Sequence, residues 1–436
     1  MSPGAEAKPP QRVAVVGGGW AGLAAAVHAT TLGHQASLYE MAPQLGGRAR
    51  SVTHDGITLD NGQHILIGAY RDTLALMRRV GVEPDQVLHR QPLTLLYPDG
   101  SGLCLPPGPA LPAFARGVWA WRELPWRQRL GLLALAAQWR WQGFRCAPAL
   151  TVAELARRCP PQAYRELIEP LCVAALNTPA EQASAQVLLT VLRDALFGEP
   201  GAADLLLPKG SLDALLPRVA GEWLRQHGAS VALGHRVMRL DVDASGADID
   251  GERYDHVVLA TPPGEAARLV ETLAPAWSRE AAAFRYQPII TAWLQASAAR
   301  WPQPMMALRA DNRRPAQFGF DLGALGGPRS TYALVVSGAA AWVDAGTNAT
   351  RSAILNQWDE AFPARQHGPV KWLDSRTEKR ATFACTPGLK RPAARVHARV
   401  TVAGDHVEGP YPATLEGAVR SGLAAVQALG RAGSGA

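Results

Sequence analysis

The stretch that decides the fold is Arg12–Gly22, which reads RVAVVGGGWAG. After the arginine come four Val or Ala residues, the composition of a fully buried strand. Gly17, Gly19 and Gly22 then fit the pattern G-x-G-x-x-G, and an alanine-rich helical segment continues to about Leu32. In this pattern the first glycine makes a tight turn, the second lets the backbone approach a pyrophosphate, and the third lets the helix pack on the strand.

A second strand and an acidic residue complete the unit. Gln35–Tyr39 is predicted as a strand, and Glu40 follows it, 18 residues beyond Gly22. At this distance an acidic side chain binds the ribose hydroxyls of an adenosine. The helix starts at Trp20 and Ala21, and its N-terminal partial positive charge faces the phosphates. We therefore predict a dinucleotide site on one βαβ unit.

The nucleotide-binding pattern returns twice further along the chain. A βαβ-like pattern resumes near Lys209 and ends in a strand at 256–260, and a last strand at Val400–Ala403 precedes a helix from about Thr414. We predict an α/β protein, in which a Rossmann-like cofactor domain is built from 11–75, 205–265 and 395–436. The insertions 76–204 and 266–394 form a mixed α+β substrate or cap domain. The pattern from about Tyr70 to Pro208 is largely helical.

Composition excludes several classes of protein. The 436 residues are 47% hydrophobic and 19% charged, which excludes disorder for most of the chain. The net charge is +7, but the basic residues are nearly all arginine, are scattered among acids and form no recognised nucleic-acid module. We expect no nucleic-acid partner, and coding bias explains most of the charge. A surface attracted to anionic lipid is the alternative.

Cysteine usage and the N-terminus bear on location. The five cysteines form no CxxC pair and no metal-type spacing, so we expect a reducing compartment and no metal. The first residues, MSPGAEAKPPQR, lack the apolar core of a signal peptide, and no apolar run is long enough to span a bilayer. We expect a cytoplasmic protein.

The segment Leu45–Arg50, LGGRAR, follows the acidic residue closely. The pair ending at Gly47 allows the chain to pass close to a cofactor. Arg48 and Arg50 can pair with a diphosphate. The alternative is a surface turn with solvated arginines.

The C-terminal segment supplies further candidate contacts. Asp405 follows Gly404 after a buried strand, where it could hold the ribityl or pyrophosphate part of an extended flavin nucleotide. Thr414 is a predicted N-cap. The helix N-terminus behind it could stabilise negative charge on a reduced flavin. The candidate residues of this turn are Thr414, Glu416, Gly417 and Ala418.

Together these segments resemble the FAD-binding scaffold of the amine oxidase and carotenoid desaturase superfamily, strongly over about 12–68 and 400–430. The resemblance implies FAD as the cofactor. It also implies a strand whose backbone contacts the adenine side, at Val237. Several members place the stretch after the GGR motif above the flavin ring, which puts Gly62, Gln63 and His64 at the cofactor.

The run Leu59–Tyr70, LDNGQHILIGAY, is similar to the hydroxysqualene dehydroxylases of hopanoid synthesis, and GPYPATLEG near the C-terminus is consistent with them. The resemblance implies that an allylic C30 alcohol loses its hydroxyl and receives a hydride from reduced FAD, giving squalene, with an electron donor that the sequence does not name. The leaving oxygen needs an acid. Asp60 and His64 are the nearest ionisable candidates, with Gln63 and Tyr411 as hydrogen-bond donors. The alternative is that Asp60 holds the loop and His64 is structural.

A tryptophan-rich segment lies at 116–145. It holds five of the 13 tryptophans, six arginines and one glutamate. Tryptophan and arginine around the apolar run Leu130–Ala137 are typical of a segment lying in the headgroup layer. We predict peripheral contact with an anionic membrane. The alternative is a helical cap whose tryptophans are core.

Two other functions share parts of this pattern. A carotenoid-type desaturase or isomerase, or an amine or protoporphyrinogen oxidase, has the same cofactor segments and differs in cavity and redox direction. A non-enzymatic lipid carrier keeps the glycine turn but does not use FAD for catalysis. Gly404-Asp405 and Glu416-Gly417 favour an enzyme.

Overall fold

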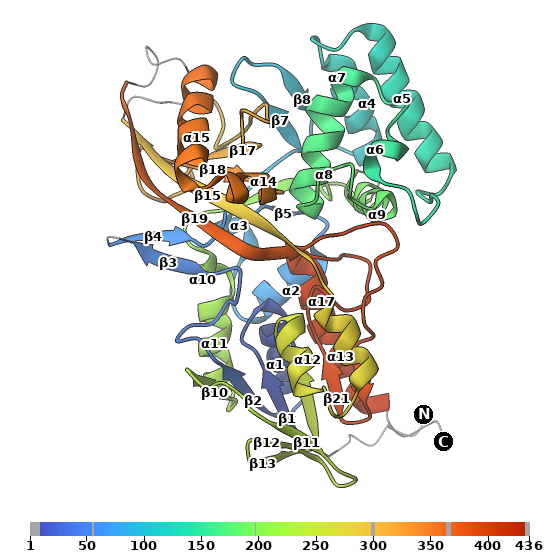
Figure 1. Ribbon diagram of the computed structural model, residues 1–436, viewed down its shortest axis with the longest axis vertical. Helices are drawn as coiled ribbons and strands as arrows, with labels where there is room; N and C mark the ends of the chain where they lie inside the picture. The colour runs from blue at the N-terminus through green and yellow to red at the C-terminus, as the bar shows by residue number, and fades with distance from the viewer. Residues whose placement is uncertain (1–8, 55, 197, 298–300, 363–367, 432–436) are drawn as a thin grey trace.

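The computed structural model describes the chain except residues 1–8, 55, 197, 298–300, 363–367 and 432–436. Its lower unit in Figure 1 is built on a six-stranded sheet in the order β10-β2-β1-β14-β21-β20. The neighbouring strands pair in parallel except β20, which is antiparallel to β21. The strands are β1 (Arg12–Val16), β2 (Gln35–Glu40), β10 (Ser230–Leu233), β14 (His256–Leu259), β20 (Arg395–His397) and β21 (Val400–Val402). The predicted α/β class with a discontinuous Rossmann-like domain is confirmed.

Strand β1 is buried on both faces, which explains its continuous apolar sequence. Val13 and Val15 pack against one layer of helices, and Ala14 and Val16 pack on the opposite side. The first layer contains α1 (Trp20–Thr31), α11 (Pro217–Gln226) and α17 (Leu415–Gln427), with α2 (Arg71–Arg79) beside α17. The second layer contains the small sheet β11 (Leu240–Val242), β12 (Ala247–Ile249) and β13 (Glu252–Tyr254).

Two more helices belong to this second layer. Helices α12 (Pro263–Leu269) and α13 (Pro275–Ala282) bury Ala266, Leu269 and Trp277 in the same core as Val257 and Val400. The packed unit around the sheet therefore continues past residue 265.

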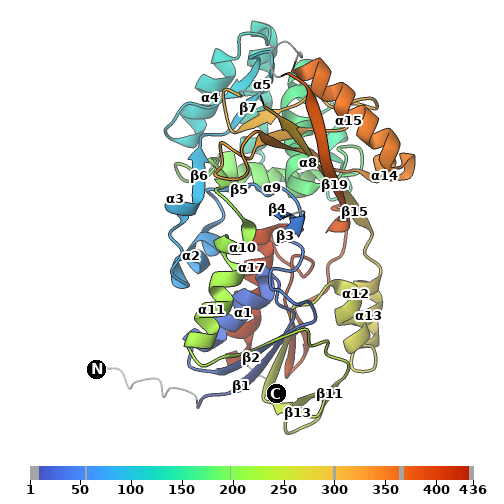
Figure 2. The same ribbon diagram turned by 90° about the vertical axis from the view of Figure 1, so that its left-hand side faces the viewer.

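The upper unit is built on a five-stranded antiparallel sheet in the order β16-β17-β18-β15-β19. Helices α14 (Ala340–Ala345) and α15 (Thr347–Ala361) share one core with this sheet, and the helices α4 to α9 share another (Figures 1 and 2). The strands are β15 (Tyr286–Ala296), β16 (Met305–Ala307), β17 (Phe318–Asp321), β18 (Thr331–Val336) and β19 (Val370–Phe383). The helices are α4 (Ala110–Ala120), α5 (Trp126–Trp141), α6 (Val152–Leu155), α7 (Pro161–Ala163), the π-helical turn Tyr164–Ile168, α8 (Glu169–Leu176) and α9 (Ala185–Leu196).

Short strands join the two units. The segment from Tyr70 to Pro208 is largely helical, as predicted, except that short apolar runs at 88–104 and 205–208 pair as strands, which sequence periodicity does not separate from helix. These are β6 (Leu88–Gln91), β7 (Thr94–Leu96), β8 (Gly102–Cys104) and β9 (Leu205–Pro208). The other short elements are β3 (Ser51–His54), β4 (Ile57–Asp60), β5 (Leu66–Ile67), α3 (Pro84–Val87), α10 (Leu212–Leu215) and the 3₁₀ turn Ala428–Arg431.

Candidate functional site

In the turn after β1, close backbone packing requires glycine at two positions. Gly17 has φ +108°, and its N–H donates to the Tyr39 carbonyl at 2.7 Å. A Cβ at Gly17 would lie 2.4 Å from the Ala260 carbonyl oxygen, and one at Gly22 would lie 1.8 Å from the Gly17 carbonyl oxygen. These two glycines therefore hold α1 against the carboxyl ends of the strands.

Gly19 is different, because the protein itself does not require it. A Cβ there would approach only the Gly47 Cα, at 3.9 Å. Gly19 is the N-cap of α1 and makes no side-chain cap, so the uncapped N–H groups of the first turn remain for a ligand. Gly47 has φ +61°, and the Gly46 N–H donates to the Gly18 carbonyl at 2.8 Å. Two glycine turns thus meet at the helix N-terminus, a cradle that fits a pyrophosphate.

Glu40 braces the same turn. Its Oε2 accepts from the Gly18 N–H at 2.6 Å and its Oε1 accepts from the Ala42 N–H at 2.7 Å. Its predicted contact with ribose stays a prediction. Trp20 closes the other side of the turn by donating its indole N–H to the Ala49 carbonyl at 3.0 Å.

Arg48 and Asp405 form an ion pair at 2.7 Å. Burial acts to raise the pKa of Asp405, but Arg48 and His406 outweigh it and hold that pKa well below its ordinary value. Burial likewise acts to lower the pKa of Arg48, and Asp405 keeps it raised. Arg48 is therefore committed to Asp405, while the Nε of Arg50 is buried without a protein partner and is available for a diphosphate.

The last helix, α17, begins with a side-chain N-cap. The Thr414 hydroxyl accepts from the Gly417 N–H at 2.9 Å, as predicted for an N-cap. A Cβ at Gly417 would lie 1.9 Å from the Tyr411 carbonyl oxygen, so glycine is needed for the turn to close. Just before the turn, the Gly404 N–H donates to the Ser421 hydroxyl at 2.7 Å. Ala418 continues the helix by bonding its N–H to the Thr414 carbonyl.

The Glu416 carboxylate caps a different helix. It accepts from the N–H groups of Asp72 and Thr73 and from the Thr73 hydroxyl, at 3.1, 3.0 and 2.7 Å. Burial raises the pKa of Glu416 more than these bonds lower it.

At the predicted adenine side, Val237 is buried and its carbonyl accepts from Arg268 at 2.8 Å. The cofactor contacts predicted for Glu416 and Val237 remain predictions.

Asp60 lies in a hydrogen-bonded cluster. Its Oδ1 accepts from the Ser51 hydroxyl at 2.6 Å and from the Leu212 N–H at 2.9 Å, which ties β4 to α10. Burial raises the pKa of Asp60 to about 6. Asp60 and Gln63 line a second, half-open pocket beside Ser211 and Leu325.

His64 has a defined tautomer. Its Nδ1 lies 2.7 Å from the Gly62 carbonyl, which can only accept, so Nδ1 carries the hydrogen. Burial, together with Arg48, lowers the pKa of His64, which favours the neutral ring. In this form Nε2 accepts a hydrogen bond, and the proton-donor role predicted for His64 would need the other tautomer or the charged ring. Its predicted catalytic role stays a prediction.

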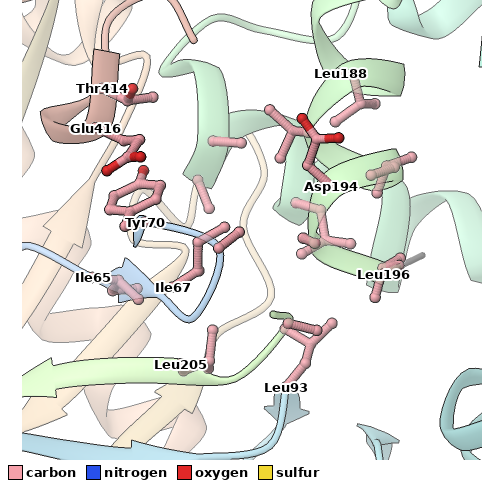
Figure 3. A pocket seen from close by; sticks show the side chains of 18 of the residues that line it. Ile65, Ile67, Tyr70, Leu93, Leu188, Asp194, Leu196, Leu205, Thr414 and Glu416 are labelled. Carbon is pink, nitrogen blue, oxygen red and sulfur yellow. The ribbon is translucent and has the colours of Figure 1, made fainter. Parts of the chain in front are cut away.

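An apolar cavity that is partly open to solvent, of about 1050 Å³ with this open part included, lies between the two units (Figure 3). Helices α8 and α9 form one wall, and the β5 segment with the start of α17 forms another. The lining is aliphatic or aromatic except for one group of polar residues. Figure 3 shows Tyr70, Thr414 and Glu416 together and Asp194 facing them from α9. The fifth polar residue is Tyr411.

Asp194 and Tyr411 are joined inside this cavity. The Tyr411 hydroxyl donates to Asp194 Oδ2 at 2.7 Å, and Arg193 donates to both Asp194 oxygens at 2.6 and 3.0 Å. Burial acts to raise the pKa of Asp194, but Arg193 and Tyr411 lower it, so the carboxylate is ionised. Burial raises the pKa of Tyr411 to about 12, so the phenol keeps its proton. The sequence did not predict Asp194 as a site residue, because an acidic residue in the last turn of an amphipathic helix is expected to lie on the solvated face.

The fold and the family of this chain are established by comparison with known proteins. Residues 20–430 match the family described as flavin containing amine oxidoreductase. The chain belongs to this family and is a flavin-dependent oxidoreductase, as predicted. An oxidoreductase from Methanosarcina mazei has the same fold, with a TM-score of 0.70 and 15% identity over 95% of this chain and 99% of that one.

Within the family, the chain is similar to the hydroxysqualene dehydroxylase of Sinorhizobium fredii, with 27% identity over 95% of this chain and 97% of the relative. The predicted resemblance to these enzymes is thereby confirmed. A 15-cis-phytoene desaturase of an Oncidium hybrid is 24% identical over 97% of this chain but only 78% of the desaturase. In the described residues, no helix has the length and apolar character needed to cross a membrane.

Proposed function

We propose that this protein is an FAD-dependent hydroxysqualene dehydroxylase, which reduces an allylic C30 alcohol to squalene. Similarity to a dehydroxylase over nearly the full length of both chains supports the proposal. The observation that carries it is the apolar cavity, whose polar residues form one group, with Asp194 on α9 opposite those near the start of α17. A long isoprenoid needs an aliphatic wall along its length and one place that binds a hydroxyl.

We place the cofactor along the glycine turns, from the N-terminus of α1 to that of α17. Bound FAD, when reduced, supplies the hydride. The protein holds its diphosphate with α1 and Arg50 and faces its ring with the N-terminus of α17. The cofactor domain comprises 11–75, 205–265 and 395–436, together with α12 and α13.

In our proposal the cavity's polar residues bind the hydroxyl. The net reaction adds one hydride and one proton and releases one water, so the carbon–oxygen bond breaks while the oxygen gains a proton. When the alcohol binds, the Tyr411 phenol turns its hydrogen from Asp194 to the departing oxygen and transfers that proton as water leaves, and the phenolate then takes a proton from solvent. The ionised Asp194 accepts from the hydroxyl of the bound alcohol and stabilises positive charge on the allylic carbon. The aliphatic wall excludes the water that would trap that cation.

The test uses purified protein reduced with dithionite under anaerobic conditions and mixed with hydroxysqualene. Mass spectrometry of the lipid extract should show squalene in a one-to-one ratio with reoxidised flavin. Oxidised protein under the same conditions is the control and should give none. Full flavin occupancy with no squalene would reject the proposal.

A carotenoid-type desaturase is the second candidate, favoured by the matching desaturase. It differs in redox direction, because a desaturase transfers hydride from the hydrocarbon to oxidised flavin. Oxidised protein mixed anaerobically with phytoene would then lose its flavin absorbance near 450 nm. We expect no bleaching with phytoene.

A further inference from the structure

Helix α5 is apolar on two opposite faces. Its buried side chains, Leu132, Leu135, Ala136 and Trp139, face the core of the upper unit. Trp126, Leu130 and Trp141 are 59%, 46% and 88% exposed. With the exposed Ala134 and Ala137 between them, they recur every three or four residues. At 3.6 residues per turn they fall within about 80° of one another, on the side opposite the buried face.

A surface helix of a soluble domain has one apolar stripe and needs no second one. The other exposed tryptophan in the part of the chain that the structure describes, Trp119, lies at the end of α4. The exposed Leu111 begins the same helix. Trp121 and Trp139 are buried, so core packing explains two of the five tryptophans here and leaves three unexplained. In both views α5 lies at the end of the molecule opposite the six-stranded sheet (Figures 1 and 2).

The charges around this apolar stripe are positive except Glu123, in the turn between the two helices. Arg127 and Arg140 are exposed on α5, at about 60–80° to either side of the middle of the stripe. Arg116, Arg122 and Arg145 are exposed on or near the ends of the two helices. Helix α5 itself contains no acidic residue. Arginines beside exposed tryptophans match the phosphates and acyl boundary of an anionic lipid surface.

The turn between the two helices is held rigidly in this arrangement. The Arg129 guanidinium donates to the carbonyls of Leu124, Trp119 and Arg122, at 2.6, 2.8 and 3.0 Å. Arg127 lies over the Trp126 ring at 5.4 Å. The exposed side chains therefore sit on a preformed hairpin.

We propose that α4 and α5 dock on an anionic bilayer, with α5 lying in the plane of the headgroups. At 16 residues α5 is about 24 Å long, enough to lie along a surface. Helix α4 packs against α9, whose side chains also line the apolar cavity. When α4 and α5 are docked, the helices α4 and α9 lie between the lipid and the cavity. This inference does not depend on the identity of the substrate.

The experiment is cosedimentation of the flavin-loaded protein with vesicles of phosphatidylcholine containing 30% phosphatidylglycerol. We expect binding at 0.1 M salt and release at 1 M salt, where the Debye length falls from about 10 to 3 Å. The double variant Trp126→Ser/Trp141→Ser should lower the partition coefficient at least about tenfold, because two interfacial anchors are lost. Arg127→Gln/Arg140→Gln should lower it on these vesicles and leave weak binding to pure phosphatidylcholine unchanged.

The matched control is Leu32→Ser/Met238→Ser, which removes two side chains of comparable exposure (53% and 60%) from the lower unit. It should bind vesicles like the parent, and all variants should keep the parent's thermal midpoint. Equal binding by the tryptophan variant and the parent would overturn the proposal. The proposal would also be overturned if the parent protein did not bind vesicles but formed a dimer in sedimentation velocity that the tryptophan variant did not form. The surface would then be a protein interface.

Discussion

Arg48 and Asp405 are 357 positions apart and form an ion pair at 2.7 Å. The second terminal nitrogen of Arg48 donates to the Ala381 carbonyl at 2.8 Å. One guanidinium therefore joins the first segment of the cofactor domain to its last segment and to strand β19 of the upper unit. Arg48 directly follows Gly47 of the second glycine turn, so the pair fixes the position of this turn relative to the last segment.

Arg48→Ala should destabilise the protein by about 2–3 kcal/mol, because it leaves the buried Asp405 without its partner. Chemical denaturation at pH 7 measures this. The lowered pKa of Asp405 means that its contribution is present above the ordinary carboxyl pKa and is lost as the pH falls through the folded-state value. The variant's deficit should therefore shrink in strong acid. Arg12→Ala, which removes the exposed pair with Glu252, is the control and should cost less than about 1 kcal/mol.

The glycine turn separates a packing role from a cofactor role. Gly22→Ala should lower stability by at least about 2 kcal/mol, because its Cβ meets the Gly17 carbonyl at 1.8 Å. Gly19→Ala should leave the stability of the apoprotein within about 1 kcal/mol, since only the Gly47 Cα is near. We expect it nevertheless to lower flavin affinity at least about tenfold. Equal flavin binding by parent and Gly19→Ala, measured by fluorescence titration, would contradict the proposed phosphate position.

Local sequence predicted the cofactor half well for a physical reason. Gly22 and Gly417 are required by contacts within their own turns, Gly17 has the positive φ of a tight turn, and Thr414 caps its own helix, so each leaves a short-range signature. The central strands β1, β14 and β21 follow from their continuous apolar sequences.

The substrate half could not be read in the same way. The role of Asp194 depends on its hydrogen bond with Tyr411, which is 217 positions away in the sequence and comes close only in the folded protein. From the sequence, Glu416 is an acidic residue in the first turn of α17, yet in the structure its carboxylate caps α2. Such pairings depend on the packing of the two units, which no local pattern records.

Asp60 gives a prediction about pH. Its pKa is about 6 in the folded protein and about 3.9 in an unfolded chain, so the folded state binds the proton more tightly. Its contribution to stability is therefore greatest below about pH 4 and is lost as the pH rises through 6. Relative to Asp60→Asn, the parent should lose on the order of 2 kcal/mol between pH 4 and pH 6.5.

The control for this measurement is Asp359→Asn, at an exposed position of α15, which should follow the parent at every pH. Urea titrations at a series of pH values give the comparison. A parent and an Asp60→Asn variant whose stabilities run parallel would contradict the raised pKa. The same variant tests the predicted catalytic role, because loss of turnover with unchanged flavin content and thermal midpoint would support it.

Asp194 and Tyr411 should control turnover without affecting the cofactor. Asp194→Asn and Tyr411→Phe should each lower kcat for dehydroxylation about 10–100-fold, the effect of losing a hydrogen bond of about 1.5–3 kcal/mol to a charged group or developing charge. Flavin content should stay at the parent level, since neither side chain contacts the glycine turn after β1, where the diphosphate is placed. Tyr164→Phe, which removes a phenol that does not line the cavity, should retain full turnover. If Asp194→Asn raised KM alone and left kcat unchanged, Asp194 would bind the alcohol without stabilising the cation, and the charge-stabilising role proposed here would be wrong.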